Sequence, residues 1–216
     1  MGVKQIKKKV IIFTDLDDTL LKENKFNNNI LNNFIKTLLK KEYEIIPLTS
    51  KTYLEVMDLL KQIKFKLPFS VENGAAYYIP LKNNKDYLYK KILNPNVIDK
   101  VAIKQILLKN IFKKYLNNIE FIEDLSLLRQ TEITKLNINQ LESFYQRDYS
   151  ISILWHGDKS IKQNFKTSLL KYNLKITFGG KLNNISGLHS KFDSMVFFTR
   201  HYEQKLREKN LVITGF

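Results

Sequence analysis

The fold of this chain is decided by VIIFTDLDDTLL, the stretch from Val10 to Leu21. It begins with four apolar residues, mostly β-branched, which is typical of a strand buried on both faces of a sheet. An acidic cluster follows directly, so its carboxylates are expected where the strand ends and solvent begins. In extended backbone Asp15 and Asp17 point to the same side, and their carboxylates can converge on one bound group.

Two converging carboxylates suit covalent phosphoryl transfer. We expect Asp15 to attack phosphorus and form an aspartyl-phosphate, and Asp17 to protonate the leaving oxygen and then activate water. Both would also bind Mg²⁺, which offsets the repulsion between carboxylate and phosphate. Thr19 would orient one of the pair, whereas Asp18 is expected to be structural. The competing interpretation is an acidic loop that only caps a helix.

Strands and helices alternate behind this stretch. Apolar residues recur with a helical period over 30–41, a short strand covers 44–48, and the capping box Thr52–Glu55 starts a second helix. Another strand, at 68–71, leads into Asn73-Gly74, a strong hairpin signal. This order predicts a parallel sheet with right-handed crossovers, in which ligands bind at the carboxyl ends of the strands.

The middle of the chain predicts a second, inserted unit. The polar segment from Lys82 to about Asn96 is expected to be a hinge, and the first unit is expected to resume with a helix over 190–205 and a strand over 211–214. We therefore predict a core of residues 1–82 and 187–216 and an α+β cap of residues 83–186. The elements expected in the cap are helices at 97–116, 125–134, 139–147 and 160–172, and strands at 151–155 and 174–178.

Polar side chains at the ends of these elements are candidates for phosphate binding. The hydroxyl of Thr49 follows the second strand and suits a phosphate oxygen, although an ordinary turn cap is an equal alternative. Lys51 could hold the anionic end of a substrate. Ser190 and Asp193 form a capping box that places Lys191 in the first turn of a helix, where backbone N–H groups attract anions. For Lys191 the alternative is a surface lysine without a function.

The composition excludes several functional classes. The 216 residues include no cysteine, so thiolate nucleophiles and Cys-based metal sites are excluded. Without a Gly-x-Ser-x-Gly elbow, a P-loop or a Gly-x-Gly-x-x-Gly motif, the sequence disfavours serine hydrolases, nucleotide kinases and dinucleotide enzymes. No signal peptide or membrane-spanning stretch is evident, and we expect a cytoplasmic protein without a membrane partner. The three histidines show no metal-ligand spacing and are interpreted as surface or packing residues: His156, His189 and His201.

The formal net charge of +15 admits two interpretations. A functional one is nucleic-acid binding, or steering of an anionic substrate into a cleft. The alternative, which we favour, is that lysines are spread over solvated faces. Since the sequence contains no basic helix, Arg-rich arm or aromatic RNA-binding signature, it does not favour a nucleic-acid partner. The oligomeric state does not follow from the sequence.

Together these residues resemble the haloacid dehalogenase (HAD) superfamily of phosphatases. Its first motif is matched by the stretch from Asp15 to Leu21, its second by Thr49 and its third by Lys191. Within the superfamily the chain is similar to the mannosyl-3-phosphoglycerate phosphatase branch. That similarity depends on four further stretches: LTSKT at 48–52, VENGA at 71–75, RDYS at 147–150 and FGGK at 178–181.

The resemblance implies an α/β fold, with a Rossmann-like core and an inserted α+β cap of type C2B that closes over the substrate. It also implies Mg²⁺-dependent removal of phosphate from a small anionic sugar phosphate, a mannosyl- or glucosyl-3-phosphoglycerate, as the last step in making a compatible solute. The alternatives are a HAD phosphatase for another ester, such as sucrose phosphate or a phosphoglycolate-type compound, or a non-catalytic sugar-phosphate-binding relative. The implied site comprises Asp15 and Asp17 for catalysis and metal binding, and Thr49, Ser50, Lys51, Asn73, Arg147, Lys181 and Lys191 for substrate binding.

One departure from the family pattern concerns the metal site. In the family, the strand that corresponds to 211–214 leads into a fourth motif, a Gly-Asp loop whose acidic residues complete the Mg²⁺ site. The sequence stops at Phe216, where that loop is expected to begin. Loss of a carboxylate ligand is expected to weaken Mg²⁺ binding severely. We expect a fragment of a longer product, a truncated and inactive relative, or a chain completed by a partner.

Overall fold

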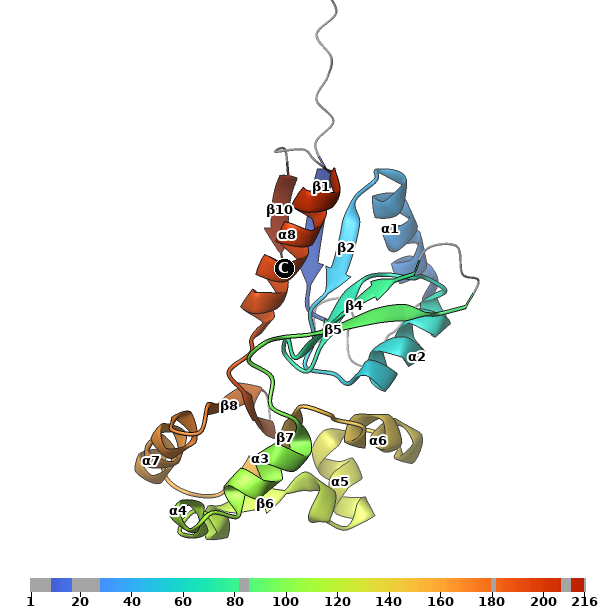
Figure 1. The fold of residues 1–216 in the computed structure, drawn as a ribbon. Helices are drawn as coiled ribbons and strands as arrows, with labels where there is room; N and C mark the ends of the chain where they lie inside the picture. Colours follow the sequence, from blue (N-terminus) through green and yellow to red (C-terminus); the bar gives the residue numbers. More distant parts are fainter. Residues whose placement is uncertain (1–8, 17–27, 82–85, 180–181, 207–210, 216) are drawn as a thin grey trace, which may run out of the picture. The chain divides into compact units, whose positions relative to one another are not determined.

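The fold was analysed in a computed structural model, which describes residues 9–16, 28–81, 86–179, 182–206 and 211–215 (Figure 1). The chain divides into two compact units. The first comprises residues 1–50, 56–94 and 190–216, and the second comprises residues 51–55 and 95–189. Among the described residues the first unit contains two sheets and the second contains one, and each unit has its own hydrophobic core. The predicted α/β architecture with a parallel sheet is confirmed.

The first unit is built on a parallel sheet with the strand order β10-β1-β2. Within it, Ile12 lies between Thr214 of β10 and Ile45 of β2. An isolated parallel bridge between Leu48 and Ser70 continues the sheet beyond β2. All these strands therefore end at the same edge, as predicted. The strands are β1 (Lys9–Thr14), β2 (Glu44–Pro47) and β10 (Leu211–Gly215).

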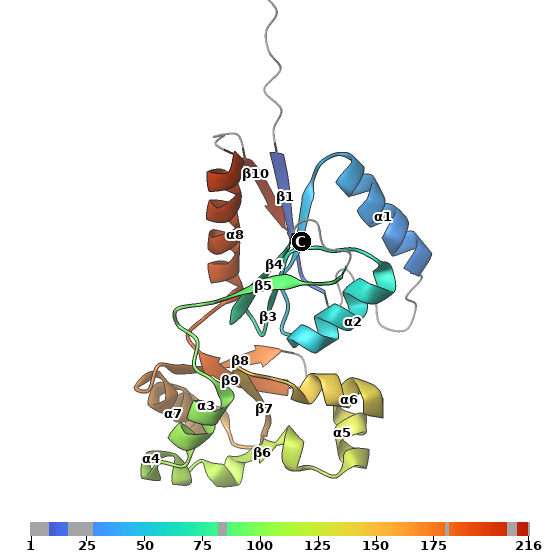
Figure 2. The same ribbon diagram turned by 45° about the vertical axis from the view of Figure 1, so that its right-hand side comes forward.

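Helices cover both faces of this sheet, with α8 on one side and α1 and α2 on the other (Figure 2). Ile11 and Phe13 of β1 pack in one buried cluster with Phe198 and Tyr202 of α8. Since side chains alternate along a strand, Ile12 faces the opposite side. Strand β1 is thus buried on both faces, as its apolar sequence predicts. The helices are α1 (Asn28–Lys40), α2 (Tyr53–Ile63) and α8 (Lys191–Leu206).

An antiparallel sheet, β3-β4-β5, completes the first unit. The predicted hairpin at Asn73-Gly74 is present, and its backbone is left-handed at Glu72, Asn73 and Gly74, with φ values of 45°, 58° and 97°. Strand β5 lies in the segment that was expected to be a hinge, and it pairs with β4 instead. The strands are β3 (Phe69–Val71), β4 (Ala76–Pro80) and β5 (Tyr89–Leu93).

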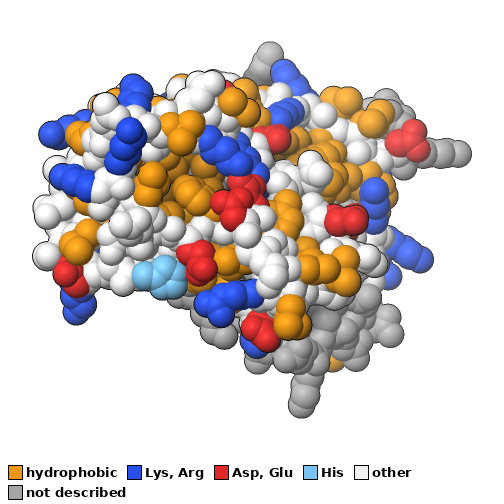
Figure 3. All heavy atoms as spheres, turned by 90° about the horizontal axis from the view of Figure 1, so that it is seen from below, with side chains coloured by type: hydrophobic (Ala, Val, Ile, Leu, Met, Phe, Trp, Pro, Cys, Tyr) orange, Lys and Arg blue, Asp and Glu red, His pale blue; other side chains and the backbone are white. Residues whose placement is uncertain are grey.

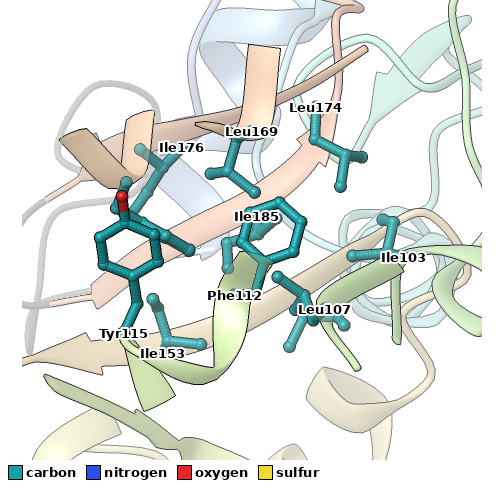
Figure 4. Close-up of a cluster of buried hydrophobic side chains, with 11 residues drawn as sticks. Ile103, Leu107, Phe112, Tyr115, Ile153, Leu169, Leu174, Ile176 and Ile185 are labelled. Carbon is teal, nitrogen blue, oxygen red and sulfur yellow. The ribbon is translucent and has the colours of Figure 1, made fainter. Parts of the chain in front are cut away.

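The second unit has an antiparallel sheet with the order β6-β7-β9-β8. Its buried core joins apolar side chains of these strands to side chains of α3, α4 and α7, which point toward one another in Figure 4. The strands are β6 (Ile119–Phe121), β7 (Ser150–Trp155), β8 (Leu174–Gly179) and β9 (Leu182–Gly187). The helices are α3 (Lys100–Leu107), α4 (Asn110–Lys113), α5 (Leu127–Thr134), α6 (Ile138–Tyr145) and α7 (Lys159–Leu170), with 3₁₀ turns at Leu116–Asn118 and Ile122–Asp124.

The prediction of one long helix over 97–116 is wrong, because the structure has two shorter helices there. Helix α3 ends at Leu107, and α4 restarts at Asn110 with Lys109 in extended backbone, at φ −64° and ψ 149°. The break lets Phe112 enter the core, where it is fully buried against Phe165. Tertiary context can override the helical period of a sequence, and the period over 97–116 does not show the break at Lys109.

Candidate functional site

The candidate site is built where β1 ends. Ile11, Ile12 and Phe13 are buried, and the chain leaves the sheet at Asp15, whose side chain is 38% exposed. The amide N–H of Leu16 donates to Oδ1 of Asp15 at 2.7 Å, and Leu16 itself is fully buried. The buried leucine therefore anchors the turn that presents the carboxylate to solvent.

Lys191 lies directly against this carboxylate. Its Nζ donates to Oδ2 of Asp15 at 2.5 Å, although the two residues are 176 positions apart in the sequence. Lys191 is the first residue of α8, as the capping box predicts. In that box the Ser190 amide donates to Oδ2 of Asp193 at 2.7 Å, and the Asp193 amide donates to Oγ of Ser190 at 3.3 Å. The start of α8 therefore aims a cation at Asp15.

Thr49 follows β2 at the same edge of the sheet and is fully buried. The Leu48 amide donates to the carbonyl of Thr14 at 2.8 Å, which joins the ends of β1 and β2. The Thr49 amide donates to the carbonyl of Ser70 at 3.2 Å, and the Thr49 carbonyl accepts from the amide of Asn73 at 2.8 Å. Thr49 is thus held through its backbone on both sides, and the half-buried Ser50 follows it.

The turn after β3 approaches the same helix start. A Cβ built at Gly74 would lie 2.0 Å from the carbonyl oxygen of Ser190, so only glycine permits this contact. Asn73, which was expected to contact substrate, lies in this turn and bonds to Thr49. Within the first unit, the structure therefore brings Asp15, Lys191, Thr49 and Asn73 into one network of contacts.

One buried pair of serines beside this network was not predicted from the sequence. Oγ of Ser70 and Oγ of Ser194 are 2.7 Å apart, and both residues are fully buried. Ser70 interrupts the apolar run of β3, and Ser194 follows Lys191 by three residues on α8. A polar residue on the buried side of two elements is the signal that could have identified them.

Two predicted substrate contacts belong to the second unit. Lys51 forms an ion pair with Glu55 at 3.7 Å, next to the predicted capping box, in which the Glu55 amide donates to Oγ1 of Thr52. Arg147 is 9% exposed, and its guanidinium lies 4.4 Å from the centre of the Phe144 ring.

Arg147 lines a small cavity of the second unit, together with Lys100, Glu123 and Tyr145. Burial by itself would raise the pKa of Glu123. Lys100 and Lys104 bind its carboxylate, however, and their effect outweighs burial, so the pKa lies below its ordinary value. Burial, with a contribution from Glu123, raises the pKa of Tyr145 to about 12.

Asp17 and Lys181 lie outside the residues that the structure describes, as do Asp18 and Thr19. Their predicted roles stay predictions.

A divalent cation needs more oxygen ligands than the described part of the site offers. Among the described residues, no group of three or more histidine, aspartate or glutamate side chains could hold a metal ion. Asp15 is the carboxylate at the end of β1, and its oxygens contact Lys191 and the Leu16 amide. The described residues therefore do not by themselves complete a Mg²⁺ site.

Charges of both signs lie on the face of the molecule that Figure 3 shows. On the face shown in Figure 3, lysine and arginine side chains lie among acidic and apolar ones. Across the described ranges, no helix combines the length and the apolar character needed to cross a bilayer.

Comparison with known sequences identifies related proteins. A family model described as haloacid dehalogenase-like hydrolase matches residues 12–208. A glucosyl-3-phosphoglycerate/mannosyl-3-phosphoglycerate phosphatase from Persephonella marina is 27% identical over 82% of this chain and 66% of its own length. A mannosyl-3-phosphoglycerate phosphatase from Pyrococcus furiosus is 28% identical over 84% of this chain and 73% of its own length. The chain thus spans about two thirds to three quarters of the length of these two relatives.

Solved structures share the fold. A protein of the haloalkanoate enzyme superfamily from Bacteroides thetaiotaomicron superimposes with a TM-score of 0.63 and 13% identity, over 99% of this chain and 79% of its own. A protein from Thermotoga maritima superimposes with a TM-score of 0.59 and 17% identity, over 94% of this chain and 78% of its own. At these identities the likeness concerns the fold alone.

Proposed function

Because this chain belongs to the haloacid dehalogenase-like hydrolase family, we propose that it hydrolyses phosphate monoesters with Asp15 as the nucleophile. The observation that carries this proposal is the contact between Lys191 and Asp15 at the end of β1. A carboxylate repels an anionic phosphate, and a neighbouring ammonium group offsets that repulsion. The contact therefore supports an anion-binding site around Asp15.

Asp15, Asp17 and Lys191 have different roles in the proposed reaction. A carboxylate oxygen of Asp15 forms a bond to phosphorus as the ester P–O bond breaks, and the electron pair of that bond goes to the leaving oxygen. Asp17 supplies the proton to that oxygen and then takes a proton from water, which hydrolyses the aspartyl-phosphate. Lys191 compensates the negative charge on the phosphoryl oxygens throughout. We propose Thr49, with Ser50 and Asn73, as further contacts of the phosphate.

We further propose Mg²⁺ as the cofactor, because the family resemblance implies it. Asp15 and Asp17 would be ligands, and Asp17 lies outside the described residues. Since the described residues do not complete the donor set, we assign no step of the reaction to the metal ion.

For the substrate we propose a glycosyl-3-phosphoglycerate, on the basis of the activities named for the relatives. Such a substrate carries a phosphate and a carboxylate, and the net charge of +15 would attract it. Lys51, Arg147 and Lys181 are proposed as contacts of its sugar or glycerate part. The product would be mannosyl- or glucosylglycerate, a compatible solute made in the cytoplasm. The alternatives are another sugar phosphate, such as sucrose phosphate, or binding of a sugar phosphate without turnover.

The proposal is tested by phosphate release. The protein is incubated with and without Mg²⁺ and with mannosyl-3-phosphoglycerate, glucosyl-3-phosphoglycerate, sucrose 6-phosphate or 4-nitrophenyl phosphate. Asp15→Asn is expected to abolish release. Asp158→Asn is the matched control, because Asp158 caps α7 in the second unit and asparagine caps a helix equally well.

Each outcome decides between the alternatives. Preference for a glycosyl-3-phosphoglycerate supports the proposed substrate, and preference for sucrose 6-phosphate supports the first alternative. Equal release by wild type and Asp15→Asn would contradict the nucleophile. Binding of the ester by calorimetry without turnover would support the non-catalytic alternative.

A further inference from the structure

We propose that Ser70 and Ser194 are positioning residues, whose buried hydrogen bond fixes Lys191 against Asp15. The proposal extends the proposed function, since it concerns the cation that compensates the phosphoryl charge. The effect of the serine pair on the contact between Lys191 and Asp15 can be tested without measuring any activity.

The geometry links the serine pair to the lysine through one turn of helix. Ser194 lies three residues after Lys191, so the two side chains leave neighbouring positions on the surface of α8. Ser70 Oγ and Ser194 Oγ are 2.7 Å apart, although the residues are 124 positions apart in sequence. Holding Ser194 against β3 therefore restricts the rotation of α8 about its axis, and with it the position from which the Lys191 side chain starts.

The backbone of Ser70 contacts a second part of the site. Its carbonyl accepts the amide N–H of Thr49 at 3.2 Å, while its side chain contacts Ser194. One residue of β3 thus joins the end of β2 to the first turns of α8. The contact of Gly74 with the Ser190 carbonyl holds the same helix at its first turn.

The chemistry of the pair favours positioning over simple packing. Ser70 lies between Phe69 and Val71, and all three residues are buried. Apolar side chains at both positions would be held by packing alone. A buried hydroxyl must keep its hydrogen-bond partner, because an unsatisfied polar group is costly in the interior. Two facing hydroxyls therefore favour the rotation of the helix in which they meet.

The test separates stability from positioning with Ser70→Ala, Ser194→Ala and the double variant. Each single change leaves one buried hydroxyl without its partner, so both are expected to lower Tm. The double variant removes both hydroxyls and is expected to regain much of that stability. If the pair positions Lys191, the double variant is expected to recover stability while Lys191 stays displaced from Asp15.

The position of Lys191 is measured by its rate of acylation with an amine-reactive ester, quantified by peptide mass spectrometry. Acylation is expected to be about two- to fivefold faster in the single and double variants, in the range by which an ion pair of this exposure shifts an equilibrium. Asp15→Asn, which removes the ion pair outright, sets the upper limit. Ser168→Ala is the matched control, because Ser168 is a buried serine whose hydroxyl lies 3.2 Å from that of Tyr115 in the second unit. It is expected to lower Tm without changing the acylation of Lys191.

Turnover of 4-nitrophenyl phosphate supplies the second readout. A positioning role predicts kcat about 10- to 100-fold lower in the double variant, the scale of a small misplacement in an active site, with Tm near that of wild type. Wild-type acylation and wild-type kcat in the double variant would overturn the proposal. If wild type itself shows no turnover but acylation still rises in the double variant, the proposed function fails and the positioning of Lys191 stands.

Discussion

A Cβ at Gly74 would lie 2.0 Å from the carbonyl oxygen of Ser190, so the turn after β3 touches the start of α8 only through a residue without a side chain. Gly74 also has a φ of 97°, which L-residues rarely adopt. One residue therefore satisfies two requirements, a left-handed backbone and a close approach to the helix that carries Lys191.

Gly74→Ala is expected to destabilise the protein by about 2–4 kcal/mol, because the unfavourable backbone and the clash add together. Urea denaturation measures this loss. Gly215→Ala is the control, since its Cβ would lie 3.5 Å from the Phe13 carbonyl, an ordinary contact. Equal stability of the two variants would contradict this account of Gly74.

Lys191→Met is expected to lower kcat/KM for phosphate esters by about 100-fold or more, because it removes the cation next to the attacking carboxylate. Lys159→Met, at the start of α7 in the second unit, is the control and is expected to retain wild-type kinetics. If Lys191→Met retains wild-type kcat/KM while Asp15→Asn is inactive, Lys191 has no role in turnover.

The ion pairs of Glu123 with Lys100 and Lys104 are expected to make the free energy of unfolding depend on pH. Lys100 and Lys104 hold its pKa below the ordinary value of 4.5 in the folded state, so its contribution is complete above that value and is lost as pH falls through the lowered pKa. Glu123→Gln is therefore expected to be less stable than wild type at pH 7 by on the order of 1 kcal/mol, and the difference should vanish at low pH. Denaturation from pH 7 downward tests this, with the exposed Glu132→Gln as the control. A difference that stays constant with pH would exclude the ion pairs as its source.

Tyr202 joins α8 to β2. Its hydroxyl donates to Oε2 of Glu44 at 3.1 Å, and burial together with this carboxylate raises the pKa of Tyr202. Tyr202→Phe is expected to cost about 1–2 kcal/mol at neutral pH, because a hydrogen bond to a charged group is lost. Thermal unfolding of Tyr202→Phe, Glu44→Gln and the double variant should show non-additive losses. Additive losses would contradict a direct interaction.

The apolar pattern of the sequence predicts the first unit better than the second. Val10 to Phe13 predicts β1 because four consecutive apolar residues suit a strand buried on both faces. The capping residues Ser190 and Asp193 predict the start of α8, since a cap depends on local hydrogen bonds. The approach of Lys191 to Asp15 was not predictable from local signals, because it depends on the order of strands in the sheet.

The elements that the sequence did not predict are short or polar. Strands β5 and β6 contain charged residues and few consecutive apolar ones, so pairing with neighbouring strands decides their structure. The strand β9 has the sequence LNNISG, in which two asparagines disfavour a strand. The Ser70–Ser194 pair was missed for a similar reason, since each serine by itself is an ordinary residue and only the tertiary structure brings the two hydroxyls together.

The separation of 176 residues between Asp15 and Lys191 has a consequence for synthesis of the chain. At typical ribosomal rates the lysine emerges roughly 10 to 35 seconds after the aspartate. Nearly all of the second unit, residues 95–189, is a continuous segment that is synthesised within this interval and can fold in it. Strand β1 meanwhile lacks its neighbour β10 and the α8 side chains that cover Ile11 and Phe13. The nascent chain is therefore expected to present the apolar strand β1 to chaperones until α8 and β10 emerge.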